Sequence, residues 1–127
     1  MNGKLKRIAA VATMTSSAVI AFAAPALAAT YSGRGDYTRE LDTVSLNATA
    51  AGRHLAYTEA TCTGATISVE LYQDFFFEPN NPQGRKGIAC GRNVGAAWNS
   101  DDNGDHFLRF RSNDRAVTVK FTWTYPR

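Results

Sequence analysis

Residues 116–125 read Ala-Val-Thr-Val-Lys-Phe-Thr-Trp-Thr-Tyr, and this stretch decides the class of fold that we expect. Apolar and aromatic side chains occupy every second position, with threonine and lysine between them. This alternation is typical of a β-strand with one buried face, and β-branched and aromatic residues favour a pleated strand over a helix. The predicted buried row comprises Val117, Val119, Phe121, Trp123 and Tyr125.

A second strand is predicted directly before it, over residues 106–111. Leu108 and Phe110 share one face there, while Arg109 and Arg111 share the other. The segment between the two strands, Ser-Asn-Asp-Arg at residues 112–115, is rich in turn formers. We therefore expect the two strands to form a β-hairpin over a hydrophobic core.

Further short strands are predicted along the rest of the chain, at residues 41–48, 53–58, 66–73 and 88–99. Turn-forming residues separate them, and no helical period appears after residue 28. This pattern predicts an all-β fold, a small antiparallel β-sandwich, with a Greek-key barrel as the alternative. The expected inward residues are Val44, Leu46 and Ala48, then Leu55 and Tyr57, then Ile67, Val69 and Leu71, and finally Val94, Ala96 and Trp98.

Residues 1–28 have the form of a bacterial signal peptide. A basic N-terminal segment precedes an Ala- and Val-rich apolar stretch, and Ala26-Leu27-Ala28 supplies a small-x-small cleavage pattern. We expect a secreted, extracellular protein that is cut before Ala29. The apolar stretch is short and interrupted by hydroxyl residues, which argues against a membrane anchor.

The remaining chain divides into two predicted parts. Residues 29–40 are polar, contain two glycines and show no sustained period, so we expect a flexible N-terminal arm. Residues 41–127 form a single β domain in this interpretation.

The charge of the chain bears on its partners. Lys4, Lys6 and Arg7 account for the formal charge of +3, so the segment after the signal peptide is close to neutral. A protein that binds nucleic acid or an anionic membrane usually has a basic surplus on one face. We therefore predict no nucleic-acid partner and no membrane contact beyond export.

Cys62 and Cys90 are the only two cysteines. In an exported protein such a pair is most simply one disulfide, which would enclose the residues between them in a ring. The spacing does not match a redox or zinc motif, because there is no C-x-x-C and no histidine at ligand distance in sequence.

Catalytic and metal-binding patterns are weak. His54 and His106 are the only histidines, both fall in or beside predicted strands, and we expect them at the surface. No serine lies in a nucleophile motif. Asp101, Asn103 and Asp105 resemble the start of a calcium loop, but a turn of Asp, Asn and Gly explains them better. We predict no enzyme activity, no cofactor and no metal.

Outward aromatic residues give the best functional signal. Three consecutive phenylalanines, at residues 75–77, follow the strand over residues 66–73, and neighbouring strand residues point to opposite faces. If the strand parity continues, the outward row is Tyr72, Asp74 and Phe76. Exposed aromatic residues are typical of interfaces. The alternative is that Phe76 packs under the loop predicted at residues 78–87 or against the N-terminal arm.

The predicted partner-binding residues also include Arg85 and Lys86 in that loop, and Tyr31 and Tyr37 in the arm. The loop lies inside the disulfide ring, which limits its movement, and the arm could add to the sheet edge of a partner. We interpret the protein as a secreted, non-catalytic module that binds another secreted protein.

The layout resembles small adaptor subunits of secreted bacterial toxin particles, which implies a place in an extracellular, toxin-like assembly. It also resembles small secreted protease inhibitors, and Arg85-Lys86 would then mimic a protease substrate. A carbohydrate-binding module, with a glycan as ligand, is the third interpretation.

Overall fold

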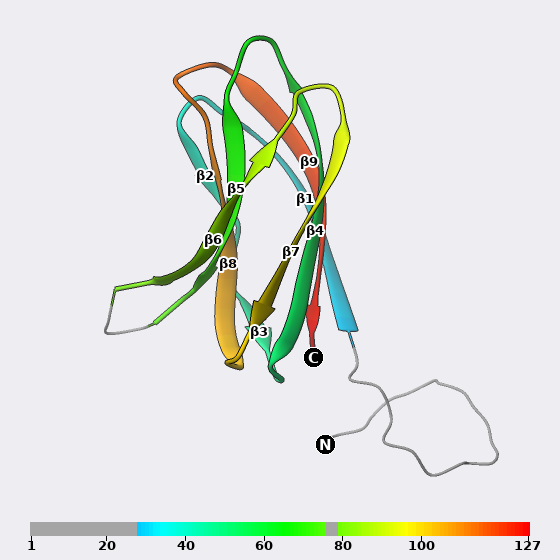
Figure 1. The fold of residues 1–127 in the computed structure, drawn as a ribbon, viewed down its shortest axis with the longest axis vertical. Helices are drawn as coiled ribbons and strands as arrows, with labels where there is room; N and C mark the ends of the chain where they lie inside the picture. Colours follow the sequence, from blue (N-terminus) through cyan, green and yellow to red (C-terminus); the bar gives the residue numbers. More distant parts are fainter. Residues whose placement is uncertain (1–27, 76–78) are drawn as a thin grey trace, which may run out of the picture.

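Two antiparallel sheets face each other in the computed structural model, which describes residues 28–75 and 79–127 (Figure 1). This arrangement confirms the predicted all-β sandwich. The predicted signal peptide, apart from Ala28, lies outside the described residues. The strands are β1 (Ala28–Tyr37), β2 (Glu40–Asp42), β3 (Leu46–Ala48), β4 (Gly52–Cys62), β5 (Ile67–Gln73), β6 (Asn81–Ile88), β7 (Asn93–Ser100), β8 (Gly104–Arg111) and β9 (Val117–Pro126).

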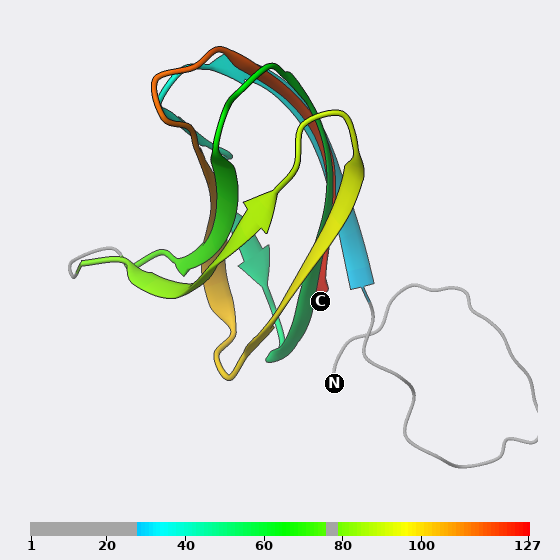
Figure 2. The same cartoon turned by 45° about the horizontal axis from the view of Figure 1, so that its top comes forward.

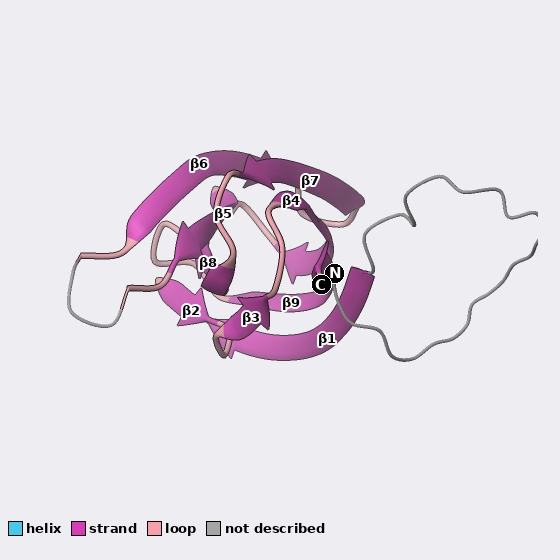
Figure 3. Ribbon diagram, turned by 90° about the horizontal axis from the view of Figure 1, so that it is seen from below, coloured by secondary structure: helices cyan, strands magenta, loops and turns pink. Residues whose placement is uncertain are grey.

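The first sheet has the order β1-β9-β4-β7, and the second has the order β2-β8-β5-β6, with β3 pairing to β8 beside β2. Seen from below, β6 lies next to β7 on one side of the sandwich, while β2 and β3 lie near β1 on the other (Figure 3). One side-chain hydrogen bond joins the sheets where β6 and β7 approach, because Trp98 Nε1 donates to the Gly84 carbonyl at 2.6 Å. No helix in the described ranges is long and apolar enough to cross a membrane.

The predicted hairpin between residues 106–111 and 116–125 is wrong. Both strands exist, but β8 belongs to the second sheet and β9 to the first. Figure 2 shows the connection between them, coloured orange, passing from one layer to the other at one end of the sandwich. Their buried rows therefore face each other across the core, where the rings of Phe110 and Phe121 lie 5.3 Å apart. Alternation predicts which side of a strand is buried, but it carries no information on the neighbouring strand.

The expectation of a flexible arm over residues 29–40 is also wrong. Residues Ala28–Tyr37 form β1, which pairs with β9 along its whole length, and β2 begins at Glu40. The two glycines of this segment, which suggested mobility, instead make room for neighbouring side chains. A Cβ on Gly33 would lie 2.7 Å from the ring of Phe121, and one on Gly35 would lie 2.5 Å from Leu41. The missing side chains let these core residues lie against the backbone of β1.

Strand β4 has the opposite inward face from the one predicted. Leu55 is half-buried and Tyr57 is exposed. The reason is the size of the neighbouring side chains on β9, because Ala56 pairs with Trp123 and Ala60 with Val119. Small residues on β4 leave room for the bulky row of β9. The inward row of β4 comprises His54, Ala56, Thr58 and Ala60, all of which are buried.

The predicted loop at residues 78–87 is largely a strand. β6 runs from Asn81 to Ile88 and pairs with β5 at the edge of the second sheet, with a register shift between Glu70 and Tyr72. Pro82 is compatible with this strand because an edge position requires no second hydrogen-bonded neighbour. In the strand over residues 41–48, Leu46 is half-buried and Ala48 is buried, but Val44 is exposed in the link between β2 and β3.

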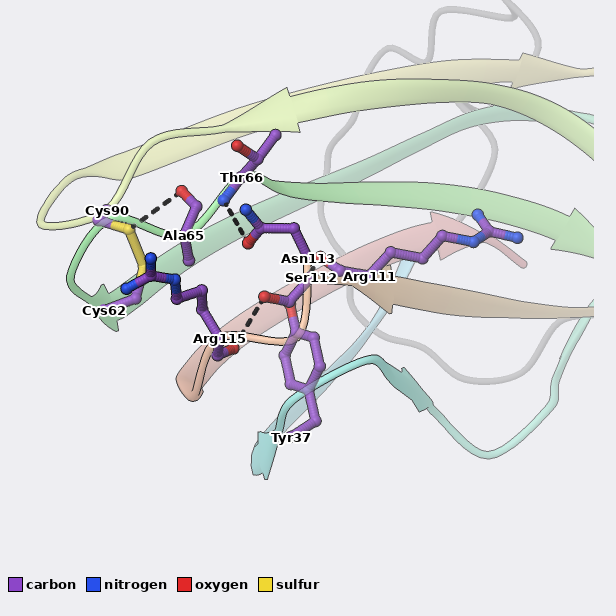
Figure 4. Close-up of a disulfide and its surroundings, with 9 residues drawn as sticks. All are labelled: Tyr37, Cys62, Ala65, Thr66, Cys90, Arg111, Ser112, Asn113 and Arg115. Carbon is purple, nitrogen blue, oxygen red and sulfur yellow. Dashed lines mark hydrogen bonds between the residues drawn. A yellow bond between two sulfur atoms is a disulfide. The ribbon is translucent and has the colours of Figure 1, made fainter.

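The disulfide between Cys62 and Cys90 is present, with a Cα–Cα distance of 5.3 Å. It connects the end of β4 to the segment that follows β6, close to the connection between β8 and β9 (Figure 4). Asn113 in that connection accepts a hydrogen bond from the Thr66 backbone at 3.0 Å, and Ser112 donates to the Arg115 carbonyl at 2.8 Å. This end of the sandwich is thus tied covalently and by hydrogen bonds.

Replacing Cys62 and Cys90 together by alanine should lower the free energy of unfolding by about 3.5 kcal/mol, because the disulfide closes a loop across a sequence separation of 28 residues. Urea unfolding at neutral pH, with reduced wild-type protein as a second test, measures the difference. A loss of less than about 1 kcal/mol would show that the ring contributes little to the stability of the sandwich.

Candidate functional site

The candidate site lies on the outer face of the second sheet, where three adjacent strands present alternating arginine, aromatic and acidic side chains. In the register of these strands, Tyr72 lies opposite Phe107, and Arg109 lies between Glu70 and Asp42. We call this group the arginine–aromatic cluster, and its members are Asp42 on β2, Glu70 and Tyr72 on β5, and Phe107, Arg109 and Arg111 on β8.

Aromatic stacking forms the base of the cluster. The rings of Tyr72 and Phe107 lie 5.2 Å apart and are nearly parallel, with an interplanar angle of 6°. The guanidinium carbon of Arg109 lies 4.9 Å from the centre of the Tyr72 ring and 5.5 Å from that of Phe107. Cation–π contacts of this kind contribute about 0.5–1 kcal/mol at partly exposed sites.

An acidic neighbour fixes the orientation of Arg109. Its Nε and Nη2 atoms donate to the two carboxylate oxygens of Asp42 at 2.8 and 2.9 Å. Glu40 adds a second carboxylate at 3.2 Å. The hydrogen bonds to Asp42 are the main cause that raises the pKa of Arg109 above its ordinary value. A two-point contact of this type fixes the plane of the guanidinium as well as its charge.

Arg111 is held in a similar way on the neighbouring part of β8. It donates to the Tyr72 hydroxyl at 2.6 Å and to Glu70 Oε1 at 3.2 Å. These hydrogen bonds, led by the one to Tyr72, raise the pKa of Arg111. The second oxygen of Glu70 accepts the backbone N–H of Gly84 at 3.1 Å. The buried carboxylate is therefore both charge-paired and hydrogen-bonded, as burial of a charge requires.

The cluster is ordered but remains reachable from solvent. The side chains of Arg109 and Arg111 are 22% and 25% exposed, whereas Glu70 is 9% exposed. Each guanidinium has five N–H donors, and only some of them are used within the cluster. The remaining N–H groups can thus donate hydrogen bonds to carboxylate or carbonyl oxygens of a molecule that lies on this face.

Two of the predicted partner-binding residues lie in this region. Tyr72 faces outward, as predicted, but it is only 8% exposed because Phe107 and the two arginines cover it. Arg85 projects from β6, and its Nε atom is 3.9 Å from Glu70. Its side chain is more than half exposed, so it lies at the rim of the cluster.

The other predicted residues on this side of the molecule are more dispersed. Asp74 follows β5 and accepts a hydrogen bond from Ser45. Lys86 is exposed on β6 and pairs in register with Val69. Phe76 lies outside the described residues, so the structure does not test its predicted exposure.

Tyr31 and Tyr37 lie in the other sheet, on β1, and neither belongs to the outer face that carries the cluster. Tyr31 is half-buried, 5.9 Å from the ring of Phe121. Tyr37 belongs to the core, where its hydroxyl donates to the Arg111 carbonyl at 3.2 Å. Burial raises the pKa of Tyr37 to about 12. Neither tyrosine is presented on a mobile arm.

Of the cluster, sequence reasoning named Tyr72 as a site residue. It missed Phe107, both arginines and their acidic partners. The outward positions of Arg109 and Arg111 were visible in the alternation of β8. Their contacts with Asp42 and Glu70 follow from the pairing of β8 with β2 and β5, which alternation does not specify.

A pair of histidines is buried between the sheets, contrary to their expected surface positions. The rings of His54 and His106 are 4.6 Å apart and both are fully buried. His54 Nδ1 accepts a hydrogen bond from Trp123 Nε1 at 3.2 Å, which places the proton of the neutral ring on Nε2. That atom has no hydrogen-bond partner among the described residues. Burial, followed by the charge of His106, lowers the pKa of His54 to about 4.

His106 also contacts a serine, as a nucleophile–base pair would. Its Nε2 lies 3.1 Å from Ser100 Oγ, and its Nδ1 bonds to the Gly104 carbonyl at 2.9 Å. In a catalytic triad a carboxylate orients the histidine, whereas here the Gly104 carbonyl takes that place. Ser100 is also buried, together with the His106 ring. The pair therefore fits a structural role in the core. Within the described ranges, no group of three His, Cys, Asp or Glu residues could hold a metal ion.

No protein-family model and no curated protein matches the sequence. Among solved structures, the Yersinia pseudotuberculosis-derived mitogen is 15% identical, with a TM-score of 0.46, over 76% of this chain and 86% of the mitogen. The infectious bursal disease virus Gt strain structure is 9% identical, with a TM-score of 0.45, over 80% of this chain and 32% of the viral chain.

A family two carbohydrate esterase from Cellvibrio japonicus is 15% identical, with a TM-score of 0.38, over 79% of this chain and 34% of the esterase. The chain thus spans about a third of the viral chain and of the esterase. These likenesses assign the chain to no family.

Arg109→Ala should lower the free energy of unfolding by about 1–2 kcal/mol, because it uncovers Tyr72 and Phe107 and leaves Asp42 without its two-point contact. Arg85→Ala is the matched control on the same face and should change stability by less than about 0.5 kcal/mol, since the Arg85 side chain is mostly exposed and its contact with Glu70 is long at 3.9 Å. Chemical unfolding of both variants checks this contrast. Equal losses would contradict the assigned role of Arg109.

Acid should destabilise the fold through the buried histidines. Since His54 has a pKa of about 4 in the fold and 6.5 otherwise, the unfolded chain binds more protons between these values. Its contribution to stability is complete above pH 6.5 and should decline by about 3 kcal/mol as the pH falls to about 4. His54→Gln should flatten this part of a stability-versus-pH curve measured by urea unfolding. An unchanged slope would rule out His54 as its source.

Proposed function

We propose that the protein is a secreted, non-catalytic module that binds another secreted protein through the arginine–aromatic cluster. One observation carries this proposal. The guanidinium of Arg109 is held against Tyr72 and Phe107 by Asp42, yet part of it remains open to solvent on an uncovered sheet face.

Both the residue types of the cluster and the order of its side chains support binding. Tyrosine and arginine are enriched among the residues that contribute most to binding at protein interfaces. Ordering a long side chain at an interface costs roughly 0.5–1.5 kcal/mol, and Arg109 and Arg111 are already ordered by their contacts within the sheet. The cluster therefore favours binding because little side-chain entropy remains to be lost.

The alternating charges of the cluster would also make it selective for one protein partner. Arg109 and Arg111 alternate with Glu40, Asp42 and Glu70, so cations and anions lie side by side. A partner must present the complementary pattern, since like charges placed in contact disfavour a wrong partner. This pattern suits a folded protein with mixed charges, such as another subunit of an extracellular assembly.

Secretion and the lack of catalysis are part of the same proposal. The disulfide between Cys62 and Cys90 fits an oxidising compartment outside the cytosol. The two histidines that could serve as general bases are fully buried. A base out of contact with substrate is unsuited to proton transfer at the surface.

A protease inhibitor is the second candidate, and the exposure of one segment favours it. Gly84, Arg85, Lys86 and Gly87 are all exposed on β6, at the edge of the second sheet and inside the disulfide ring. An extended edge segment can be bound by a partner through its backbone, with the basic side chains entering specificity pockets.

Affinity capture tests both candidates. The protein, tagged at its C-terminus and used as bait in the culture fluid of its producer, should capture one secreted protein at a one-to-one ratio. Arg109→Lys keeps the charge but loses the two-point contact and the stacking, and should weaken capture about tenfold or more. The control, Arg53→Gln on the first sheet, should capture as well as the wild type.

The outcomes separate the candidates. Equal capture by wild type and Arg109→Lys would contradict the proposed surface. Capture of a serine protease that survives Arg109→Lys but is lost when Arg85 and Lys86 are both changed to alanine would assign the inhibitor function instead. Melting temperatures of the variants show whether a loss of capture reflects unfolding.

A further inference from the structure

The outer face of the first sheet carries a second, different set of side chains, which we call the hydroxyl face. Its residues form rows across the strands, because directly opposed residues share a face. Three rows are complete, and their members from β1 to β7 are Thr30, Thr124, Leu55 and Ala97, then Ser32, Thr122, Tyr57 and Gly95, then Arg34, Lys120, Glu59 and Asn93.

Tyr57 presents an exposed aromatic ring on this face, which we call the platform. It is 48% exposed, and among the described residues Val44 is the other large hydrophobic side chain that is exposed. A Cβ on its neighbour Gly95 would lie 2.9, 3.3 and 3.5 Å from three consecutive ring atoms of Tyr57. The ring therefore lies against the glycine backbone, and its other side is open to solvent.

Paired hydroxyl groups lie beside the platform. Ser32 Oγ and Thr122 Oγ1 are 3.2 Å apart, and Thr30 Oγ1 and Thr124 Oγ1 are 3.4 Å apart. Thr122 is also the neighbour of Tyr57 across the strands. Each hydroxyl has one donor and two acceptor positions, so a pair bonded to itself still presents sites to a ligand. An open aromatic ring with hydroxyls on the next two strands matches a chain of pyranoses, each of which has an apolar ring face and hydroxyls at its rim.

Two cations lie opposite each other in the next row. Arg34 and Lys120 are directly paired in the register of β1 and β9, an arrangement in which like charges repel. Within the described part of the chain, neither forms an ion pair. With Glu59, Thr61 and Thr118 they line a shallow depression of about 180 Å³. The charged groups of its lining are two cations and one anion, so an anionic group complements it.

We propose that the hydroxyl face binds an acidic polysaccharide, with one sugar ring on Tyr57, the hydroxyls of the next sugar at Thr122 and Ser32, and a carboxylate between Arg34 and Lys120. Adjacent rows are about 6.6–6.8 Å apart along a strand and neighbouring strands are about 4.7–4.9 Å apart, so a chain of sugars that lies diagonally over the sheet reaches both parts of the site. The depression is smaller than the ~300 Å³ of a small-molecule pocket, which suits one group of a polymer that rests on the surface.

This site is separate from the arginine–aromatic cluster, since it lies on the other sheet. Polysaccharide binding at the hydroxyl face is therefore independent of protein binding at the arginine–aromatic cluster, and an experiment can refute either one without the other.

Calorimetric titration of the full secreted chain with three probes tests the proposal. Oligomannuronate carries the carboxylates, β-1,4-mannan oligosaccharide has the same sugar configuration and linkage without them, and oligoglutamate has carboxylates without sugar rings. Oligogalacturonate serves as a second uronate. We expect a uronate to bind, the mannan to bind about tenfold more weakly or worse, and oligoglutamate not to bind.

Variants separate the parts of the site. Tyr57→Ala should weaken uronate binding about tenfold or more, while Tyr57→Phe keeps the ring and should bind nearly as well. Gly95→Ala should also weaken binding, because its methyl group would displace the ring. Lys120→Gln should remove the preference for uronate over mannan. NMR shifts on titration should cluster at Tyr57, Gly95 and Thr122, with Arg109 unaffected.

Three results would overturn the proposal. The first is no binding of either uronate. The second is binding that Tyr57→Ala leaves unchanged. The third is binding of oligoglutamate as tight as that of oligomannuronate, which would make the face a cation patch for acidic peptides.

Discussion

The sandwich depends on the contact between β8 and β9 across its core. The ring of Phe110 on β8 lies 5.3 Å from Phe121 on β9 and 6.5 Å from Tyr37 on β1. Because two strands that follow each other in sequence enter opposite sheets, their buried rows face inward toward each other. Their outer rows consequently point away on opposite sides, with Arg109 on one face and Lys120 on the other. One connection thus sets both candidate binding surfaces.

The sequence predicted burial well where alternation was strong, as at Val69 and Leu71, and the two cysteines gave the correct disulfide. It failed where the identity of a neighbour decides the outcome. The inward residues of β4 are small alanines because Trp123 lies beside them. The glycines of β1 are needed because Phe121 and Leu41 lie against its backbone. The outward faces of Arg109 and Arg111 were visible in the alternation, but neither was predicted as a site residue, because their acidic partners depend on strand pairing.

The two outer faces differ in how their charges are compensated. On the second sheet, Arg109 and Arg111 are bonded to carboxylates and to a tyrosine, so the surface is rigid. On the first sheet, Arg34 and Lys120 oppose each other beside hydroxyl groups and an open tyrosine ring. Exposed ion pairs contribute little to stability, roughly 0–1 kcal/mol. The two proposals assign the rigid mixed-charge face to a protein partner and the hydroxyl face to a saccharide.

Backbone NOEs in the isotope-labelled protein most directly test the central claim, that β8 and β9 lie in opposite sheets and so place two distinct surfaces back to back. The claim predicts cross-strand contacts of Thr122 on β9 with Ser32 on β1 and Tyr57 on β4, and contacts of Arg109 on β8 with Asp42 and Glu70. A continuous ladder of NOEs between β8 and β9, as in a hairpin, would contradict it, because Arg109 and Lys120 would then belong to one sheet.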